Sequence, residues 1–351
     1  LWRTEPLKVV VTGGGGFVGC HVVERFAKKG HDVLAIDSFA RAAVLGEHFL
    51  GAATSRYNWN YIAQLPRVTR LEADIRDAKA MEKATQGADV ILHTAAQVAV
   101  TTSMKDPKTD FDINVVGTVN VLEGARKSGA DPAVVFCSTN KVYGDHVNRI
   151  PVREGATRYT FADPAFDQGI PESFETDHAH HTPYGASKLA ADLYVQEYAR
   201  SYGLRTGAFR MSCIYGTRQF GMEDQGWVAH FVLSACFGRP LMIYGDGKQV
   251  RDVLFVDDLV SAFEAYIVKA STLGGEVLNL GGGPDFTMSL LELLSILETE
   301  LGHRIPVSYG GWRPADQKVY ISNIHRASER LGWKPQTRPE EGVHRIIDWI
   351  R

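Results

Sequence analysis

The sequence predicts a doubly wound α/β fold, in which helices cover both faces of a parallel β-sheet, with a smaller α/β domain toward the C-terminus. Three observations lead to this prediction. Short β-branched runs alternate with helical patterns as far as residue 210. A glycine-rich turn joins the first run to the first helix, and the pattern becomes irregular beyond residue 210. We therefore expect a large domain of residues 1–210 plus about 253–270, and a second domain of residues 211–252 and 271–351.

The first strand, turn and helix have the pattern of a dinucleotide site. Residues Lys8–Thr12 form a β-branched run, a glycine-rich turn follows, and Cys20–Lys28 is helical in pattern. In this Rossmann-type arrangement the first glycine permits a tight turn, the second lets a pyrophosphate approach the backbone, and the third lets helix and strand pack closely. Free N–H groups at the helix N-terminus face the phosphates. The expected contacts in the turn are Gly13, Gly16, Phe17, Val18 and Gly19.

A carboxylate at the end of the second strand indicates which dinucleotide binds. The strand Asp32–Ile36 ends in Asp37, near the usual spacing of about 20 residues for a group that bonds the adenosine ribose. A carboxylate there repels a 2′-phosphate, so NAD is favoured over NADP, although Arg41 weakens that preference. A turn residue at a strand end is the alternative interpretation of Asp37. Ser38 and Arg41 complete this part of the expected cofactor site.

The next two strands also end in candidate cofactor contacts. The third strand is Val68–Ala73 and the helix after it Lys79–Thr85. The fourth strand, Asp89–His93, is followed by small residues that let the chain pass close to a flat ligand. The helix Phe111–Lys127 carries an Asn whose buried amide is either structural or a ligand contact. The expected contacts are Asp74, Ile75, Ala95, Ala96, Gln97 and Asn114.

Three polar side chains form a candidate proton-handling set. The fifth strand, Ala133–Ser138, is followed by Thr139. The helix Thr182–Tyr202 opens with Tyr184 and Lys188, which share one helix face because they are four residues apart. A hydroxyl at the end of a neighbouring strand can meet them there. This is the set that hydride transfer from an alcohol requires.

The chemistry depends on the charge around the tyrosine. A free Tyr has a pKa of about 10 and is a poor base at neutral pH. An ammonium at Lys188 and a positive nicotinamide ring both favour the phenolate. Tyr184 then takes the proton of a substrate hydroxyl that Thr139 holds, while hydride leaves the same carbon. The alternative is a Tyr that packs on its helix and a solvated Lys.

The region beyond the sixth strand, Thr206–Arg210, carries a second candidate site. Arg251 and Arg313 each lie at a turn, where two guanidinium groups can grip a diphosphate. Surface ion pairs are the alternative for each. A diphosphate substrate in addition to NAD indicates a nucleotide sugar. The strands and helices expected here are Val228–Phe237, Val253–Val256, Asp257–Ala270, Val277–Leu280, Ser289–Leu301, Ile324–Leu331 and Glu340–Ile350.

Composition argues against several other classes of protein. The formal net charge is −3 and basic residues are scattered, so no nucleic-acid partner is expected. The four cysteines lack CxxC spacing, which argues against a zinc site or a disulfide framework, and we predict no metal site. No apolar run reaches membrane-spanning length and no signal peptide is visible, so we expect a cytoplasmic protein without a membrane partner.

Together these motifs resemble the extended short-chain dehydrogenase/reductase family, the nucleotide-sugar epimerases and dehydratases. The resemblance covers essentially the whole chain. It implies a tightly bound NAD that is regenerated in each cycle, and a C-terminal domain that holds the nucleotide sugar. The residues that carry it are Thr12–Gly19, Asp37, Asp74, Ile75, Ala95–Gln97, Asn114, Thr139, Tyr184, Lys188, Arg251 and Arg313. The implied substrate contacts are Thr139, Asn140, Lys141, Cys213, Arg218, Gln219, Gln225, Arg251, Arg313 and Asp316.

The residues after the fifth strand narrow the resemblance. Dehydratases of this family carry Thr-Asp-Glu where this chain has Thr139-Asn140-Lys141, so it lacks the acid/base pair for elimination. The segment instead resembles the subfamily of CDP-tyvelose epimerases, which implies inversion at C2 of a CDP-linked hexose through a 2-keto sugar, with CDP-glucose as a further candidate substrate. Similar segments are Thr157–Thr160, Arg218–Phe220, Asp224–Trp227 and Gly247–Val253, and Cys213 stands where the wider family usually has Asn.

Other functions stay open on the sequence. A UDP-hexose 4-epimerase uses the same machinery with a different bound pose. A dehydrogenase that releases NADH and a non-catalytic NAD-binding protein are further alternatives. By resemblance we also expect a homodimer or homotetramer that pairs through the helices around Val115–Lys127 and Leu189–Tyr202.

Overall fold

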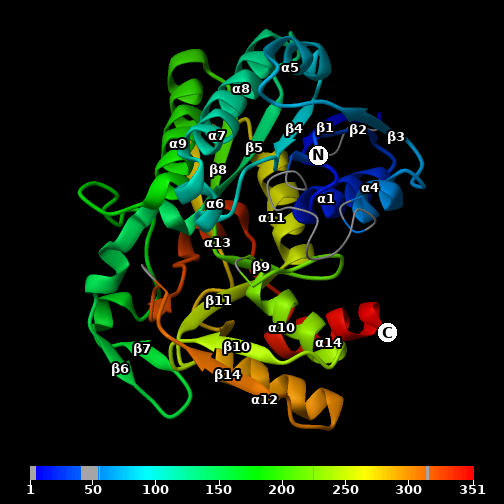
Figure 1. The fold of residues 1–351 in the computed structure, drawn as a ribbon. Helices are drawn as coiled ribbons and strands as arrows, with labels where there is room; N and C mark the ends of the chain where they lie inside the picture. The colour runs from blue at the N-terminus through cyan, green and yellow to red at the C-terminus, as the bar shows by residue number, and fades with distance from the viewer. Residues whose placement is uncertain (1–4, 41–53, 55, 224, 314–315) are drawn as a thin grey trace.

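The computed structural model describes residues 5–40, 54, 56–223, 225–313 and 316–351. Its larger part is built on a seven-stranded sheet in the order β12-β8-β5-β4-β1-β2-β3 (Figure 1). All neighbouring strands run parallel, which confirms the predicted α/β fold. The strands are β1 (Lys8–Thr12), β2 (Asp32–Asp37), β3 (Val68–Glu72), β4 (Val90–His93), β5 (Ala133–Thr139), β8 (Arg205–Met211) and β12 (Glu276–Leu280).

Helices cover both faces of this sheet, because each buries an apolar stripe against it. One face carries α1 (Phe17–Lys28), α4 (Tyr57–Ile62), α11 (Val256–Lys269) and α13 (His325–Leu331). The other face carries α5 (Ala78–Thr85), α8 (Gly117–Lys127) and α9 (Thr182–Tyr202), with α6 (Val100–Lys105) and α7 (Pro107–Phe111) beside α9.

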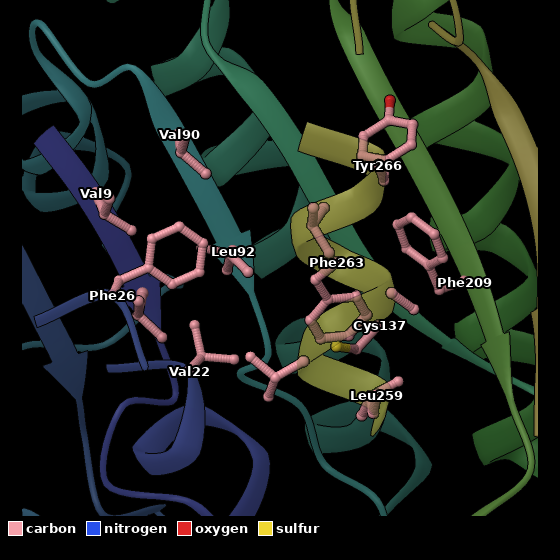
Figure 2. Packing of buried hydrophobic residues seen from close by; sticks show 14 of the residues in the cluster. Val9, Val22, Phe26, Val90, Leu92, Cys137, Phe209, Leu259, Phe263 and Tyr266 are labelled. Atoms are coloured by element: carbon pink, nitrogen blue, oxygen red, sulfur yellow. The ribbon is translucent and has the colours of Figure 1, made fainter. Parts of the chain in front are cut away.

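Figure 2 shows the first of these two packed faces. Phe26 from α1 lies over β1 and β4, and Phe263 from α11 lies over the neighbouring part of the sheet. The rings of Phe263 and Phe209 are 5.4 Å apart between centroids. Each buried ring stabilises the fold by roughly 1.5–3 kcal/mol. The sheet is thus a firm platform for the residues at its carboxyl edge.

Most of the chain beyond β8 forms a smaller α/β unit. Its strand β11 pairs with β9, β13 and β15, and β10 pairs with β14. It has a separate apolar core. Its elements are β9 (Cys213–Tyr215), α10 (Trp227–Cys236), β10 (Leu241–Tyr244), β11 (Val250–Phe255), β13 (Thr287–Ser289), α12 (Leu290–Leu301), β14 (Val307–Gly310), β15 (Val319–Tyr320) and α14 (Pro339–Ile350).

Two strands lie on the other side of the predicted domain boundary. We assigned residues 276–280 to the second domain, but β12 is an edge strand of the large sheet, where it pairs with β8. We assigned the strand from Val253 to the large domain, but β11 lies in the small unit, and only the helix α11 that follows packs on the large sheet. Both strands are apolar runs, and such a run does not specify which strand it pairs with.

The remaining differences between predicted and observed elements concern single helices and loops. The predicted loop 211–227 contains β9, and the predicted helix 111–127 is split by a π-helical turn, η1 (Asp112–Val116). The long connection 145–181 holds short elements, namely part of η2 (Asn140–Arg149), with β6 (Val152–Glu154), β7 (Tyr159–Phe161) and η3 (Pro164–Phe166). In the described ranges, no helix combines the length and apolarity needed to cross a membrane.

Candidate active site

One cavity of about 1150 Å³ lies at the carboxyl edge of the parallel sheet and continues into the small unit. Almost all of the predicted site residues line it. From the expected cofactor site these are Gly13, Gly16, Phe17, Val18, Gly19, Asp37, Ser38, Asp74, Ile75, Ala95, Ala96, Gln97, Tyr184 and Lys188. From the expected substrate site they are Thr139, Asn140, Lys141, Cys213, Gln219, Gln225, Arg251, Arg313 and Asp316. Arg41 lies outside the described residues.

The glycine turn at one end of the cavity has the geometry that a dinucleotide needs. Gly13 adopts a left-handed backbone with φ +73°, and the Gly16 N–H donates to its carbonyl oxygen over 2.9 Å. A Cβ on Gly19 would lie 2.0 Å from that same oxygen, so only glycine fits there. The helix α1 begins directly after this turn, with its first N–H groups toward the cavity edge. These residues fit the phosphates of NAD.

Asp37 lies at the same end and is tied to the turn. One of its oxygens accepts the Gly15 N–H over 2.9 Å, and the other accepts the Phe39 N–H over 2.9 Å. Burial raises the pKa of this carboxyl, while the backbone hydrogen bonds lower it. The carboxylate therefore orders the glycine turn and lines the cavity beside it, where a negative charge would disfavour the 2′-phosphate of NADP.

Two predicted site residues do not line the cavity. The Asn114 amide accepts the Gln97 N–H over 2.9 Å and donates to the Gln97 carbonyl and to Ser187 Oγ, each over 3.0 Å. Of the two interpretations of Asn114, a structural amide or a ligand contact, these hydrogen bonds support the structural one. The side chain holds the loop after β4 against α9. Arg218 instead pairs with Glu24 of α1 and lies 4.5 Å from the centre of the Tyr61 ring. The sequence does not show which face of a loop an Arg occupies.

The three residues of the candidate proton-handling set line the same cavity. Thr139, at the end of β5, is close enough to Tyr184 to lower the pKa of its phenol, and the Lys188 ammonium donates to the Cys137 carbonyl over 2.6 Å. Tyr184 is 8 % exposed and Lys188 is 3 % exposed. The three side chains thus meet in a largely desolvated corner of the cavity.

The electrostatics of this corner differ from our expectation. We expected Lys188 to favour the phenolate of Tyr184. Burial instead raises the pKa of Tyr184 to about 12, although the Thr139 hydrogen bond lowers it. Burial also lowers the pKa of Lys188 to about 8. When NAD is bound, its oxidised nicotinamide would supply a hydride acceptor and a positive charge.

A buried network below this corner was not predicted. Ser138, next to Thr139, donates to Asp192 over 2.6 Å, and Asp192 lies one helical turn beyond Lys188 on α9. Arg210 of β8 donates to the same carboxylate over 3.1 Å. The network fixes the end of β5 against the helix that carries the Tyr and the Lys. Nothing in the local sequence marks these residues, because each interaction joins distant segments.

The small unit contributes the opposite end of the cavity. Arg251, 8 % exposed, donates to Asp316 over 2.7 Å. Arg313 pairs with Glu223 over 2.9 Å and lies 4.1 Å from the centre of the Tyr244 ring. Each Arg is therefore in an ion pair and also lines the cavity. Cavity residues that the sequence analysis missed include His180, His181, Trp227, His230, Gln249 and Gln317.

Comparisons with known proteins agree with this geometry. The NAD dependent epimerase/dehydratase family matches residues 9–281. CDP-paratose 2-epimerase of Salmonella typhi is 35 % identical over 98 % of this chain and 99 % of that protein. A putative UDP-glucose 4-epimerase of Methanocaldococcus jannaschii is 31 % identical over 98 % of each chain. The solved UDP-glucuronic acid 4-epimerase of Bacillus cereus, in complex with UDP-glucuronic acid and NAD, superposes with a TM-score of 0.81 at 26 % identity, over 98 % of this chain and 99 % of that one. The chain belongs to the NAD-dependent epimerase/dehydratase family of extended short-chain dehydrogenases/reductases and is an NAD-dependent nucleotide-sugar epimerase.

Proposed function

We propose that this enzyme inverts C2 of a CDP-linked hexose, as in the conversion of CDP-paratose to CDP-tyvelose. The reaction type rests on one observation. Tyr184, Thr139 and Lys188 converge in the cavity, while Asn140 and Lys141 supply no carboxylate for elimination. The CDP-sugar and the C2 position are supported by the similarity to CDP-paratose 2-epimerase over almost the full length of both chains.

The chain's own residues carry out the proton chemistry. Thr139 would hold the 2-hydroxyl, and Tyr184, as the phenolate that the positive charge of bound NAD would favour, would accept its proton. NAD would supply the acceptor for the hydride of C2. Lys188 orders the corner through its bond to the Cys137 carbonyl. Once the 2-keto sugar had turned, Tyr184 would return the proton, and the reduced cofactor would supply the hydride to the opposite face. No net oxidation results.

The cavity suits a substrate that must turn in place. Because the keto sugar has to present both faces, the enzyme gains little from gripping it tightly in one pose. Affinity must then come from the parts of the substrate that do not react. Arg251 and Arg313 line the far end of the same cavity, where they can bind a diphosphate.

A UDP-hexose 4-epimerase is the second candidate. It is favoured by the UDP-glucose 4-epimerase of Mycolicibacterium smegmatis, which is 30 % identical over 98 % of this chain and 99 % of that protein. The proton-handling set is the same for both reactions, and only the bound pose of the sugar differs. A net dehydrogenase or a non-catalytic NAD-binding protein has no comparable support.

A substrate panel separates the candidates. Purified enzyme is incubated with CDP-paratose, CDP-glucose, UDP-glucose and UDP-galactose, and products are identified by chromatography and NMR. We expect C2 epimers from the CDP-sugars. Turnover of the UDP-sugars at C4 with inert CDP-sugars would favour the second candidate. Accumulation of NADH with a stable keto or acid product would indicate a dehydrogenase.

A further inference from the structure

Lys141 brings a half-buried amine into the same cavity as the proton-handling set. It follows Thr139 by two residues, and its N–H donates to Thr139 Oγ1 over 3.3 Å. Its carbonyl oxygen packs against α9 directly after Tyr184, since a Cβ on Gly185 would lie 2.9 Å from it. The side chain lines the cavity together with Tyr184 and Arg251. The backbone of Lys141 therefore adjoins the proton-handling set, while its amine reaches Gln317 near the small unit.

This amine is not neutralised by an ion pair. Within the described ranges it donates to Gln317 Oε1, a neutral acceptor, over 3.2 Å. The neighbouring carboxylate, Asp316, is occupied by Arg251 and by the Gln317 N–H. Burial and the Arg251 charge lower the pKa of Lys141 to about 8, and Asp316 and Cys213 act in the opposite direction. A half-buried cation that has lost part of its hydration and has no anionic partner is destabilised, and an anionic ligand would relieve this cost.

The chemistry of the substrate indicates where such an anion lies. In a nucleotide sugar, C1 carries the phosphate. C2 is bonded to C1, whereas C4 lies on the opposite side of the ring. An enzyme that oxidises C2 must therefore hold the anomeric phosphate next to its catalytic Tyr, while one that oxidises C4 holds it farther away. Of the two cations, Lys141 is the one whose backbone adjoins Thr139 and the start of α9, whereas Arg251 comes from β11 of the small unit.

We propose that Lys141 binds the anomeric phosphate of the substrate and thereby selects C2 over C4 for oxidation. The inference rests on the proposed function and adds the residue that determines its regiochemistry. Arg251 and Arg313 then bind the outer part of the diphosphate. Lys141 does not take part in proton or hydride transfer, so its loss should change which carbon reacts and how tightly the nucleotide binds.

The test compares Lys141→Met with Lys318→Met as matched control. Lys318 is one residue from Gln317 but is exposed and does not line the cavity. Both variants and the wild type are given CDP-glucose, which has hydroxyls at C2 and C4, and the ratio of the two epimers is measured by NMR. We expect only the C2 epimer from the wild type and from Lys318→Met. Lys141→Met should lose at least 10-fold in C2 inversion and shift the ratio toward the C4 epimer.

Nucleotide binding gives a second readout that does not depend on turnover. The affinity for CDP, measured calorimetrically, should fall roughly 10- to 100-fold in Lys141→Met, the usual loss for one charge-assisted hydrogen bond. In the wild type it should fall as the pH rises through about 8 and the amine loses its proton, whereas Lys141→Met should lack this dependence. If Lys141→Met does not fold, Lys141→Gln, which removes the charge and keeps a polar side chain, takes its place in both measurements.

The outcomes separate this inference from the proposed function. A wild type that forms only C4 epimers overturns both. A wild type that inverts C2, with a Lys141→Met variant that keeps the product ratio and the CDP affinity, overturns this inference alone. A wild-type CDP affinity that is flat between pH 7 and 9 also contradicts it.

Discussion

At the scale of single residues, Tyr184 carries the central chemical step. Tyr184→Phe removes the proton acceptor and leaves the ring packing in place. We expect kcat to fall by roughly 10²- to 10⁴-fold, the usual contribution of a positioned acid/base group, with NAD binding retained. Tyr309→Phe, on an exposed position of β14 outside the cavity, is the matched control. Near-normal turnover by Tyr184→Phe would remove Tyr184 from the mechanism.

Asp192 is the residue on which the buried network depends. Asp192→Asn leaves the Arg210 guanidinium, which is 7 % exposed, without its charge partner. Breaking one partner of a buried ion pair typically costs about 3–5 kcal/mol of unfolding free energy, which denaturant titration measures. Glu123→Gln breaks the exposed pair with Arg126 and should cost about 1 kcal/mol or less. Equal effects of the two substitutions would show that the network does not stabilise the fold as described.

At the scale of elements, the turn between β1 and α1 holds the cofactor. Gly19→Ala introduces a Cβ 2.0 Å from the Gly13 carbonyl oxygen, so the turn or the helix must move. We expect at least a 10-fold loss of NAD affinity, measured by the nucleotide released on denaturation and by titration of the apoprotein. Gly274→Ala meets only ordinary contacts of 3.5 Å or more and serves as the control. Full NAD occupancy in Gly19→Ala would contradict the assignment of the turn.

The elements also show what the sequence could predict. The glycine turn, Tyr184 with Lys188 and the helix Thr182–Tyr202 were found because their signals are local, and the structure has α9 over the same residues. The sequence did not decide between the two interpretations of Asn114, and it placed Arg218 among the substrate contacts although Arg218 does not line the cavity. Both outcomes depend on which distant segment the side chain meets. The same holds for β12, whose apolar run would suit either sheet. Burial of Tyr184 outweighed the charge effect expected from Lys188, since the sequence does not give the depth of a side chain.

At the scale of the whole molecule, an apolar surface runs along the helices on one face of the large sheet. Leu193 and Tyr194 on α9 are 53 % and 47 % exposed, and Val116 beside α8 is 39 % exposed. Large exposed apolar side chains grouped on neighbouring helices are typical of an interface. We propose that the enzyme pairs through this surface.

Light scattering tests the proposed pairing. We expect a dimer or tetramer at micromolar concentration for the wild type, and a smaller species for Leu193→Asp. Phe237→Asp, which alters an exposed apolar residue after α10, should leave the mass unchanged. A monomeric wild type would exclude pairing through α8 and α9.

The most direct test of the account is proton NMR of CDP-paratose with the purified enzyme in deuterated water, without added NAD. We expect a second sugar spectrum, inverted at C2 and free of deuterium, because the hydride is removed and returned within one active site. Inversion with deuterium at C2 would contradict hydride transfer and indicate enolisation next to a carbonyl. An unchanged spectrum with folded, NAD-loaded enzyme would contradict the proposed substrate.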